Sequence, residues 1–389
     1  MKAGWQTGKL GNFLEIQNGY AFSSKDYADS GCFLMRIGNV QNGYISLSDP
    51  KFINIHLNSP LQRFVLSGGD ILVSLTGNVG RVGVIENECL PAVLNQRVAR
   101  ITINNDSPVT REFLLLFLYS DLFREELVGA GHGAAQQNVS TKDIVEIRLP
   151  VPPLSEQRRI VNILDEAFDG IATAKANAEK NLKNAKALFE SHLQSVFTKR
   201  GEGWVETTLG EVCEYINGKA HEQCIDENGR YIVINSKYIS SEGRIFKRSN
   251  KAFQLLNPSD IAMVLSDVPN GKALAKCFLV EESDKYTLNQ RICLIRSKKF
   301  NTKYLFYQLN RNRHFLAFDN GGNQTNMRLN QVLSCPLFLP PIQEQESIAT
   351  KLDDVKEKTQ RLESIYQQKI TALDDLKKSL LHQAFSGEL

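Results

Sequence analysis

The chain has 389 residues, a formal net charge of +3, and 42% hydrophobic against 23% charged residues. This composition predicts a soluble globular protein of two or three domains and excludes a histone-like protein that binds nucleic acid through bulk charge. The polar start has no signal-peptide core, and no apolar run approaches the roughly 18 residues that span a membrane, so we expect a cytoplasmic protein.

The first 150 residues predict a mixed α/β module. Runs of β-branched residues bounded by Gly or Asn indicate strands at 70–75, 82–85 and 97–103, and an amphipathic pattern near 110–127 indicates one helix. From Ile160 onward, apolar residues alternate at three and four positions, as in a helix with one narrow apolar seam. This helix is expected to have about 40 residues and a length of roughly 60 Å.

The second half of the chain repeats the first. A strand is predicted at 231–234, a helix near 302–316, and a second long helix from Ile348 with the same apolar spacing. The opening pattern of the chain recurs 199 residues later. Its residues Trp5, Leu10, Gly11, Glu15, Asn18 and Gly19 recur as Trp204, Leu209, Gly210, Glu214, Asn217 and Gly218.

We therefore predict an α+β fold with a pseudo-two-fold internal repeat. Two homologous mixed α/β modules, 1–150 and 201–339, are separated by two long helices, 151–200 and 340–389. A seam of this length is unstable alone in water, so the helices are expected to pair with each other. Because the link at 198–203 is too short for a parallel return, we expect an antiparallel coiled coil.

Seven scattered cysteines form no CxxC pair, and His221 and Cys224 have no second pair of ligands nearby, so we expect reduced core thiols and no metal site. Motifs for catalysis are also missing. Lys272 in a Gly-Lys pair is followed by Ala273 rather than Ser or Thr, which excludes a P-loop. Residues 257–260 lack the aromatic side chain on which a methyltransferase would stack a flipped adenine. We expect a non-catalytic chain that binds no cofactor.

The doubled order of module, proline-rich entry and long helix resembles the specificity subunit of a type I restriction-modification system. The resemblance is carried by residues 149–157 with 160–165, and again by 339–345 with 348–353. It implies that each module is a target recognition domain that reads one half of a bipartite, asymmetric sequence in double-stranded DNA. It also implies that the coiled coil sets the spacer and docks two methyltransferase (modification) subunits.

The resemblance assigns the chemistry to partners. The modification subunits would use S-adenosylmethionine to methylate adenine at N6, and motor and nuclease (restriction) subunits would use ATP and Mg to cleave DNA. The proline-rich entries would lie near the partner-binding region, although a helix start favoured by proline and the helix dipole explains them equally well. The candidate partner-binding residues are Pro153, Glu156, Gln157, Pro341, Glu344 and Gln345.

Reading a DNA sequence needs paired donors and acceptors, such as Arg toward guanine and Asn or Gln toward adenine. The glycine-rich turn at 76–81 lets the backbone approach phosphates, and two polar loops recur at one position of the repeat. Each loop also has a simpler interpretation as a turn, and the Asn-Gln-Arg triplets as ties to nearby backbone. The candidates in the first module are Asn18, Thr76, Gly77, Asn78, Arg81, Asn95, Gln96, Arg97, Gln136, Gln137 and Asn138.

The second module offers corresponding candidates together with cations that would contact phosphates, although surface cations are usually only solvated. These candidates are Asn217, Lys219, Arg244, Lys247, Arg248, Lys272, Asn289, Gln290, Arg291, Gln324, Thr325 and Asn326.

Two alternatives to a specificity subunit are a stand-alone two-headed DNA-binding regulator and a coiled-coil scaffold that binds proteins. The charge of the first module argues against a solitary DNA binder, because residues 1–150 carry 13 Lys and Arg against 14 Asp and Glu. Residues 201–339 carry 18 against 14. We expect weak DNA affinity until partner subunits close around the duplex.

Overall fold

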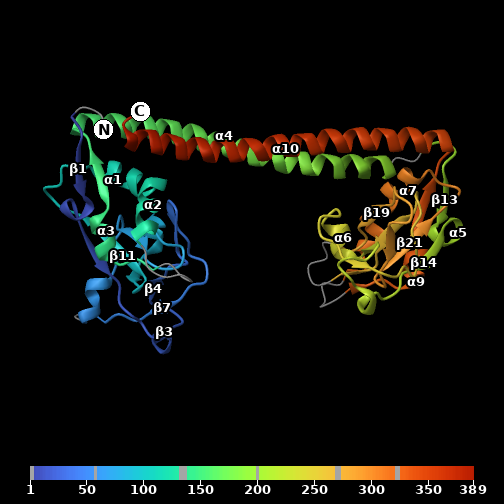
Figure 1. Ribbon diagram of the computed structural model, residues 1–389, viewed down its shortest axis with the longest axis horizontal. Coiled ribbons are helices and arrows are strands. Elements are labelled where there is room, and N and C mark those ends of the chain that lie inside the picture. Colours follow the sequence, from blue (N-terminus) through green and yellow to red (C-terminus); the bar gives the residue numbers. More distant parts are fainter. Residues whose placement is uncertain (1–3, 57–58, 131–137, 199–200, 268–272, 320–324) are drawn as a thin grey trace. The chain divides into compact units, whose positions relative to one another are not determined.

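The computed structural model describes residues 4–56, 59–130, 138–198, 201–267, 273–319 and 325–389 (Figure 1). The chain divides into two compact units. The first unit comprises Met1–Glu179 and Gln367–Leu389, and the second comprises Lys180–Tyr366. Each unit therefore contains one module together with parts of both long helices.

The first module is built on two four-stranded sheets whose central strands are buried. The first sheet is antiparallel throughout, and the second contains one parallel pair, β10 with β4. The strand predictions at 70–75, 82–85 and 97–103 are confirmed to within a residue or so. The first sheet is β2 (Leu14–Asn18), β11 (Val98–Ile103), β8 (Ile71–Ser74) and β9 (Val82–Val84); the second is β10 (Ala92–Leu94), β4 (Cys32–Met35), β7 (Phe52–Ile53) and β3 (Tyr27–Ala28); two further pairs are β1 (Gln6–Lys9) with β12 (Arg148–Val151) and β5 (Val40–Gln41) with β6 (Tyr44–Ile45).

The second module repeats this order of strands. Its parallel pair is β15 with β20, and β13 pairs with β23 as β1 does with β12. The strand predicted at 231–234 is confirmed as β15. The strands are β13 (Val205–Thr208) with β23 (Pro336–Leu339); β14 (Glu214–Asn217), β21 (Ile292–Arg296), β17 (Ile261–Val264) and β19 (Cys277–Leu279); β16 (Arg248–Ser249), β15 (Tyr231–Ile234) and β20 (Tyr286–Leu288); and β18 (Ser266–Asp267) with β22 (Thr325–Asn326).

The prediction of one continuous helix in each module is wrong, because a capping side chain breaks each helix. In the first module Ser120 donates to the Phe117 carbonyl and accepts from the Phe123 amide, which ends one helix and begins the next. In the second, Asn312 accepts from the His314 amide at the start of a new helix. The module helices are α1 (Arg111–Leu118), α2 (Asp121–Ala130), α3 (Thr141–Glu146), α5 (Leu209–Val212), α6 (Ser236–Ser240), α7 (Thr302–Leu309), α8 (Arg313–Leu316) and α9 (Leu329–Leu333).

Both long helices form. Helices α4 (Leu154–Thr198) and α10 (Ile342–Ser386) have 45 residues each, slightly more than predicted. In the first unit, Arg159 donates to the Leu389 carbonyl at 2.7 Å, and Lys175 Nζ lies 2.6 Å from Asp374 Oδ1. As the residue number rises along α4 it falls along α10, so the two helices pack antiparallel, as the sequence predicts (Figure 1).

The ends of the long helices complete the module cores. In the first unit, the Phe385 ring near the end of α10 lies 5.1 Å from that of Phe113 and 5.2 Å from that of Phe117. In the second unit, Phe197 near the end of α4 lies 5.5 Å from Tyr304. Each module core thus includes an aromatic residue from a long helix, so the predicted boundaries at 150 and 339 exclude part of each core.

Candidate DNA-recognition sites

Each module contains a close crossing of two chain segments at the Asn-Gly dipeptide that ends β2 or β14. A Cβ atom on Gly19 would lie 2.1 Å from the Asn95 carbonyl oxygen, and one on Gly218 would lie 1.9 Å from that of Asn289. Only glycine permits this approach. The crossing is held by backbone hydrogen bonds, such as that from the Gln96 amide to the Tyr20 carbonyl at 2.9 Å.

Two further segments join each crossing. In the first module the Leu75 amide donates to the Arg97 carbonyl at 3.0 Å, and Thr76 bridges to Asn138. In the second, the Leu265 amide donates to the Arg291 carbonyl at 3.0 Å. We call the resulting clusters the first junction, formed by Asn18, Thr76, Asn95, Gln96, Arg97 and Asn138, and the second junction, formed by Asn217, Ser266, Asn289, Gln290, Arg291 and Asn326.

The two arginines of the junctions point into solvent, whereas the asparagine that begins each triplet shapes its turn. Asn95 Oδ1 accepts from the Arg97 amide at 3.4 Å, and Asn289 Oδ1 accepts from the Arg291 amide at 3.5 Å. This is the simpler role considered for the triplets. Arg97 and Arg291 are exposed and form no salt bridge with any other described residue. Their guanidinium groups are therefore available to a ligand.

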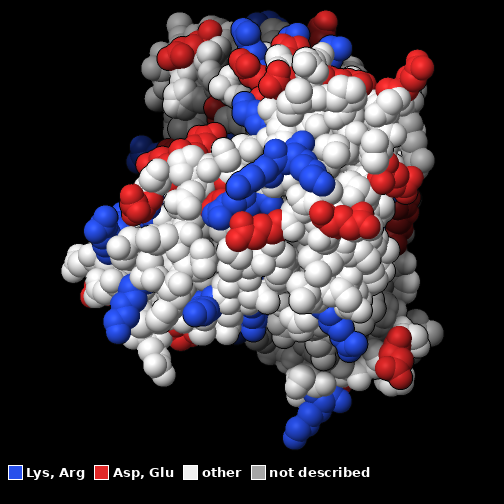
Figure 2. Space-filling model, turned by 90° about the vertical axis from the view of Figure 1, so that its right-hand side faces the viewer, with Lys and Arg blue, Asp and Glu red and all other residues white. Residues whose placement is uncertain are grey.

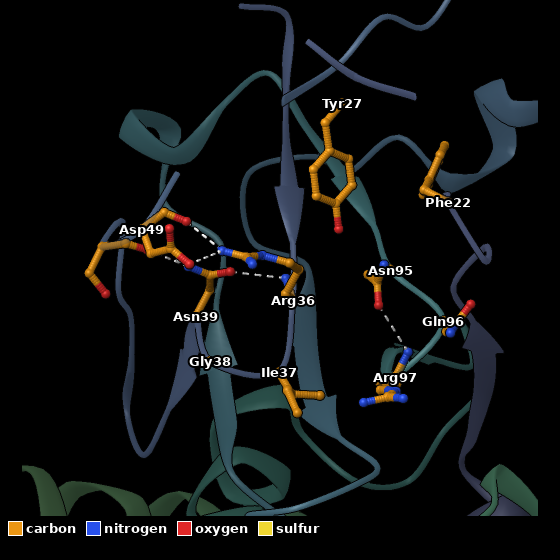
Figure 3. A pocket seen from close by; sticks show the side chains of 11 residues that line it. Phe22, Tyr27, Arg36, Ile37, Gly38, Asn39, Asp49, Asn95, Gln96 and Arg97 are labelled. Carbon is orange, nitrogen blue, oxygen red and sulfur yellow. Dashed lines mark hydrogen bonds and ion pairs between the residues drawn. The ribbon is translucent and has the colours of Figure 1, made fainter. Parts of the chain in front are cut away.

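A polar pocket of about 380 Å³ adjoins the first junction (Figure 3). In the close-up, the Tyr27 hydroxyl points into the pocket from above, and the Asn95 side chain points toward the backbone amide of Arg97 at the lower edge. Arg36 Nη2 donates to Asp49 Oδ2 at 2.9 Å, and this guanidinium lowers the pKa of the Asp49 carboxyl. The buried Asn39 donates to the carbonyl oxygens of two serines and closes the loop that follows β4.

Sequence reasoning missed the pocket residues Phe22, Tyr27, Arg36 and Asn39. These residues come together only through strand pairing, because β4 and β10 are parallel and both end at this edge of their sheet. A second pocket, of about 410 Å³, adjoins the second junction and is lined by four predicted residues. These are Asn217, Gln290, Arg291 and Asn326.

Tyr215 supplies a further polar group at the second pocket. Its hydroxyl donates to Asn217 Oδ1 at 2.7 Å, and burial raises the pKa of Tyr215. The hydroxyl therefore keeps its proton and orients the Asn217 amide. Gln290 Nε2 donates to Glu222 Oε1 at 3.3 Å, so the side-chain amide of Gln290 is held as well.

The glycine-rich turn at 76–81 lies beside the first junction. Gly77 and Gly80 have φ values of 71° and 77°, which favour glycine, and Asn78 is exposed. Arg81 Nη1 donates to Gln41 Oε1 at 2.8 Å, so this cation is tied to the hairpin β5–β6. Thr76 Oγ1 is buried and finds no hydrogen-bond partner among the described residues.

The remaining candidates have mixed outcomes. Thr325 is buried and donates to Asp319 Oδ1, so a direct DNA contact by this side chain is incompatible with the structure. Lys219, Arg244 and Lys247 are exposed, and Arg248 is half-buried. Four predicted residues lie outside the described part of the chain: Gln136, Gln137, Lys272 and Gln324.

Two of the predicted partner-binding residues have a structural role instead. Gln157 is fully buried: its Oε1 accepts from the Thr110 amide, and its Nε2 donates to two proline carbonyls. Gln345 is buried in the same way: its Oε1 accepts from the Asn301 amide, and its Nε2 donates to the Pro340 carbonyl. Direct partner contacts by these glutamines are therefore excluded.

The other four predicted partner residues stay at or near the surface. Pro153 and Pro341 are exposed. Glu156 is paired with Arg159 at 2.7 Å, and Glu344 Oε1 accepts from Trp204 Nε1 at 2.9 Å. Their role toward a partner stays a prediction.

Charge is mixed over the molecular surface. Figure 2 shows Lys and Arg side chains gathered in the middle of one face, with Asp and Glu side chains directly beside them. Within the described residues there is no group of three or more His, Cys, Asp or Glu side chains arranged for a metal ion. All seven cysteines are free, and burial raises the pKa of Cys213 to about 11. No described helix is both long and apolar enough to cross a membrane.

These features define a class of protein: a chain with two similar α/β modules, each with a polar junction, and two long helices that pack antiparallel. The chain belongs to the family of the type I restriction modification DNA specificity domain, which matches residues 2–184 and again 201–372. The resemblance noted in the sequence is thereby confirmed.

Known relatives agree with this membership. The chain is 24% identical to the StySPI specificity subunit of Salmonella potsdam over 99% of its own length and 89% of that protein. It is 32% identical to the EcoAI specificity subunit of Escherichia coli and 27% identical to the MjaVIII specificity subunit of Methanocaldococcus jannaschii. Those two matches cover 42% and 47% of this chain, but only 28% and 43% of the relatives.

Solved structures share the fold. A chain from a study of complex assembly and conformational transition of the type I R-M system matches with a TM-score of 0.81 at 18% identity, covering 100% of this chain and 99% of that one. The HsdS subunit from Thermoanaerobacter tengcongensis matches with a TM-score of 0.60 at 18% identity, covering 100% and 98%. The relatives support the specificity-subunit interpretation rather than the regulator or the scaffold.

Proposed function

We propose that this chain is the DNA sequence-specificity subunit of a type I restriction-modification complex, and that each junction reads one half of a bipartite target. The observation that carries the proposal is the duplicated junction. In both modules, four segments that are distant in the sequence bring an exposed Gln and an exposed Arg together with three Asn side chains. Such side chains match the donor and acceptor patterns of base edges.

The two junctions are similar in backbone but differ in their surroundings. Tyr20 beside the first junction is replaced by Lys219 beside the second, and Thr76 by Ser266. The first pocket contains Arg36 and Asp49, whereas the second contains Tyr215 and Leu329. Different surroundings favour different base sequences, so the two halves of the target are expected to differ.

Catalysis is assigned to partners. In the proposed complex two modification subunits bind S-adenosylmethionine and methylate adenine, and restriction subunits use ATP and Mg for translocation and cleavage. The long helices supply the docking surface and set the spacer. Both helices carry large apolar side chains that are between one third and about one half exposed, as a docking surface requires. They are Leu154, Ile163, Leu188, Ile342, Leu362, Ile365 and Leu376.

The complex is proposed to act in the cytoplasm. The proposal is tested by co-expressing the chain with a type I adenine methyltransferase subunit in a host that lacks its own type I system. Sequencing of modified bases should reveal a new bipartite motif with methylated adenine. Cells that express the methyltransferase alone serve as the control. A soluble, assembled complex without any new bipartite motif would refute the proposal.

A further inference from the structure

The loop that follows α6 presents two large apolar side chains to solvent. Ile245 and Phe246 are 50% and 49% exposed, and we call this pair the apolar tip. Arg244 and Lys247 on either side are also exposed. Two adjacent large apolar side chains that a module leaves in water point to a binding partner.

The loop is held firmly at both ends. Gly243 has a φ of 80°, and its amide donates to the Tyr238 carbonyl at 2.9 Å. The Ile245 amide donates to Ser241 Oγ at 2.9 Å. The Lys247 carbonyl accepts from the Val233 amide at 2.9 Å. Because its backbone is hydrogen-bonded on both sides, the apolar tip is a preformed projection that loses little conformational entropy on binding.

Strand register places the apolar tip near the second junction. β15 pairs antiparallel with β16, with Ile232 opposite Arg248, and the bond from the Val233 amide to the Lys247 carbonyl keeps the chain beside β15 up to the neighbour of Phe246. The Ile234 carbonyl accepts from the Asn289 amide at 3.1 Å. Lys247, next to Phe246, is therefore about two strand spacings, roughly 10 Å, from β20, which leads into the triplet of the second junction.

Cations dominate the surroundings of the apolar tip. The Arg248 guanidinium lies over the Phe246 ring, 5.4 Å from its centroid. Residues 235–250 contain Lys237, Arg244, Lys247 and Arg248 but only one acidic residue, Glu242. An apolar pair within a cationic rim fits a partner that combines phosphates with flat apolar surfaces, which is the chemistry of duplex DNA.

The first module also exposes apolar side chains in the corresponding loop, but the charges around them differ. Its hairpin β5–β6 lies in the corresponding loop after β4 and exposes Tyr44 at 57%, and Leu47, two residues after β6, is 45% exposed. The cation at its base, however, is neutralised, because Arg36 pairs with Asp49. Residues 36–51 contain two cations against one acid, compared with four against one in the second module.

We propose that the apolar tip inserts between base pairs of the half-site read by the second junction, and that Arg244, Lys247 and Arg248 hold the flanking phosphates. The inference rests on the proposed function. Insertion of apolar side chains partly unstacks and kinks DNA, at the lowest cost where a pyrimidine is followed by a purine. The second half-site is thus read partly through the deformability of one base step.

The test uses the chain assembled with its methyltransferase subunit. The complex is bound to a duplex that contains the bipartite sequence identified by sequencing of modified bases. The fluorescent adenine analogue 2-aminopurine, which brightens when it unstacks, is placed in turn at each position of the second half-site except the methylated adenine. The wild-type complex should brighten the probe at one step. Phe246→Ala should abolish this signal and weaken binding roughly tenfold, whereas Phe246→Trp should retain it. Tyr44→Ala is the matched control and should leave the signal unchanged.

Three other outcomes would contradict the inference, and the last of them would also contradict the proposed function. If Phe246→Ala keeps both the fluorescence change and the affinity while the bipartite motif is still methylated, the inference is wrong and the proposed function stands. If Phe246→Ala instead releases the methyltransferase subunit, measured by size-exclusion chromatography, the apolar tip is a protein contact and the inference is also wrong. A wild-type complex that methylates no bipartite motif would overturn both.

Discussion

Arg97 and Arg291 occupy the same place in the two junctions, at the start of a strand and next to an exposed glutamine. Each has an exposed guanidinium, whereas other arginines of the modules are engaged, such as Arg36 with Asp49 and Arg296 with Asp260. An arginine that is held by its backbone but free at its side chain is suited to bidentate contact with guanine.

Arg97→Ala and Arg291→Ala should each relax specificity in one half of the target only. Loss of a bidentate base contact costs about 1–3 kcal/mol of discrimination. The measurement is methylation of a library in which each target position is randomised. Each variant is the control for the other, and a substitution that altered both half-sites equally would contradict the assignment of one junction to one half.

His221 occupies the position of Phe22 in the repeat but differs from it in chemistry. Its side chain is fully buried, with Nδ1 2.7 Å from the Lys219 carbonyl and Nε2 3.0 Å from Thr287 Oγ1. Burial lowers the pKa of His221 below its ordinary value of 6.5. The folded second unit therefore holds this histidine neutral.

This burial predicts a dependence of stability on pH. Below about pH 6.5 the unfolded chain binds a proton at His221 that the folded chain excludes, so the free energy of unfolding should fall as the pH falls. His221→Phe, which restores the residue of the first module, should flatten this dependence. Urea unfolding between about pH 5 and pH 7 measures it, and identical slopes for the two proteins would show that another group is responsible.

At the scale of elements, the entry to each long helix is tied to the module before it. Gln157 in the first turn of α4 accepts from the amide of Thr110, the residue that caps α1. Gln345 in α10 accepts from the amide of Asn301, which caps α7. The recurring Glu-Gln motif thus joins a long helix to a module helix by hydrogen bonds that are shielded from water.

Gln157→Leu should destabilise the first unit, because it preserves volume but leaves the Thr110 amide and two carbonyl groups without their partner. Each buried group left unsatisfied costs about 1–3 kcal/mol. Thermal unfolding measures the loss. The control Glu156→Gln changes the neighbouring residue, whose surface pair with Arg159 contributes at most about 1 kcal/mol. Equal losses in the two variants would contradict the role of Gln157.

At the scale of the whole molecule, each long helix contributes to both units, and each unit contains parts of both helices. The contacts of Lys175 with Asp374 and of Arg159 with Leu389 show the pairing of α4 with α10 in the first unit. If these helices act as the proposed spacer, their length is the quantity that selects the distance between half-sites.

Removal of one heptad from each helix at matched positions, 176–182 in α4 and 366–372 in α10, should shorten the spacer in the methylated motif. Seven residues correspond to roughly 10 Å of helix, or about three base pairs. Sequencing of methylated DNA from cells with the shortened chain measures the change. The two half-site sequences should stay the same, and an unchanged spacer would refute the role of the helices as a ruler.

The neutral first module also leads to an expectation for DNA affinity. With 13 cations against 14 acids in residues 1–150, the chain alone displaces few counterions. DNA affinity in the absence of partner subunits is therefore expected to be weak.

Much of the architecture is visible in the sequence because its signals are local or internal. The repeat follows from matching residues such as Trp5 and Trp204, and the long helices follow from their apolar spacing. The break at Ser120 was missed because the apolar pattern continues across it, while a single hydroxyl ends the helix.

The sequence by itself determined the two modules, the two long helices and the candidate Asn-Gln-Arg triplets. Only the tertiary structure decided which side chains face a ligand. Strand pairing joins Thr76 to Asn138 and turns Thr325 inward, packing buries Gln157 and Gln345, and the held loop leaves Ile245 and Phe246 in water. Burial and exposure depend on contacts between residues far apart in the chain, which no local pattern records.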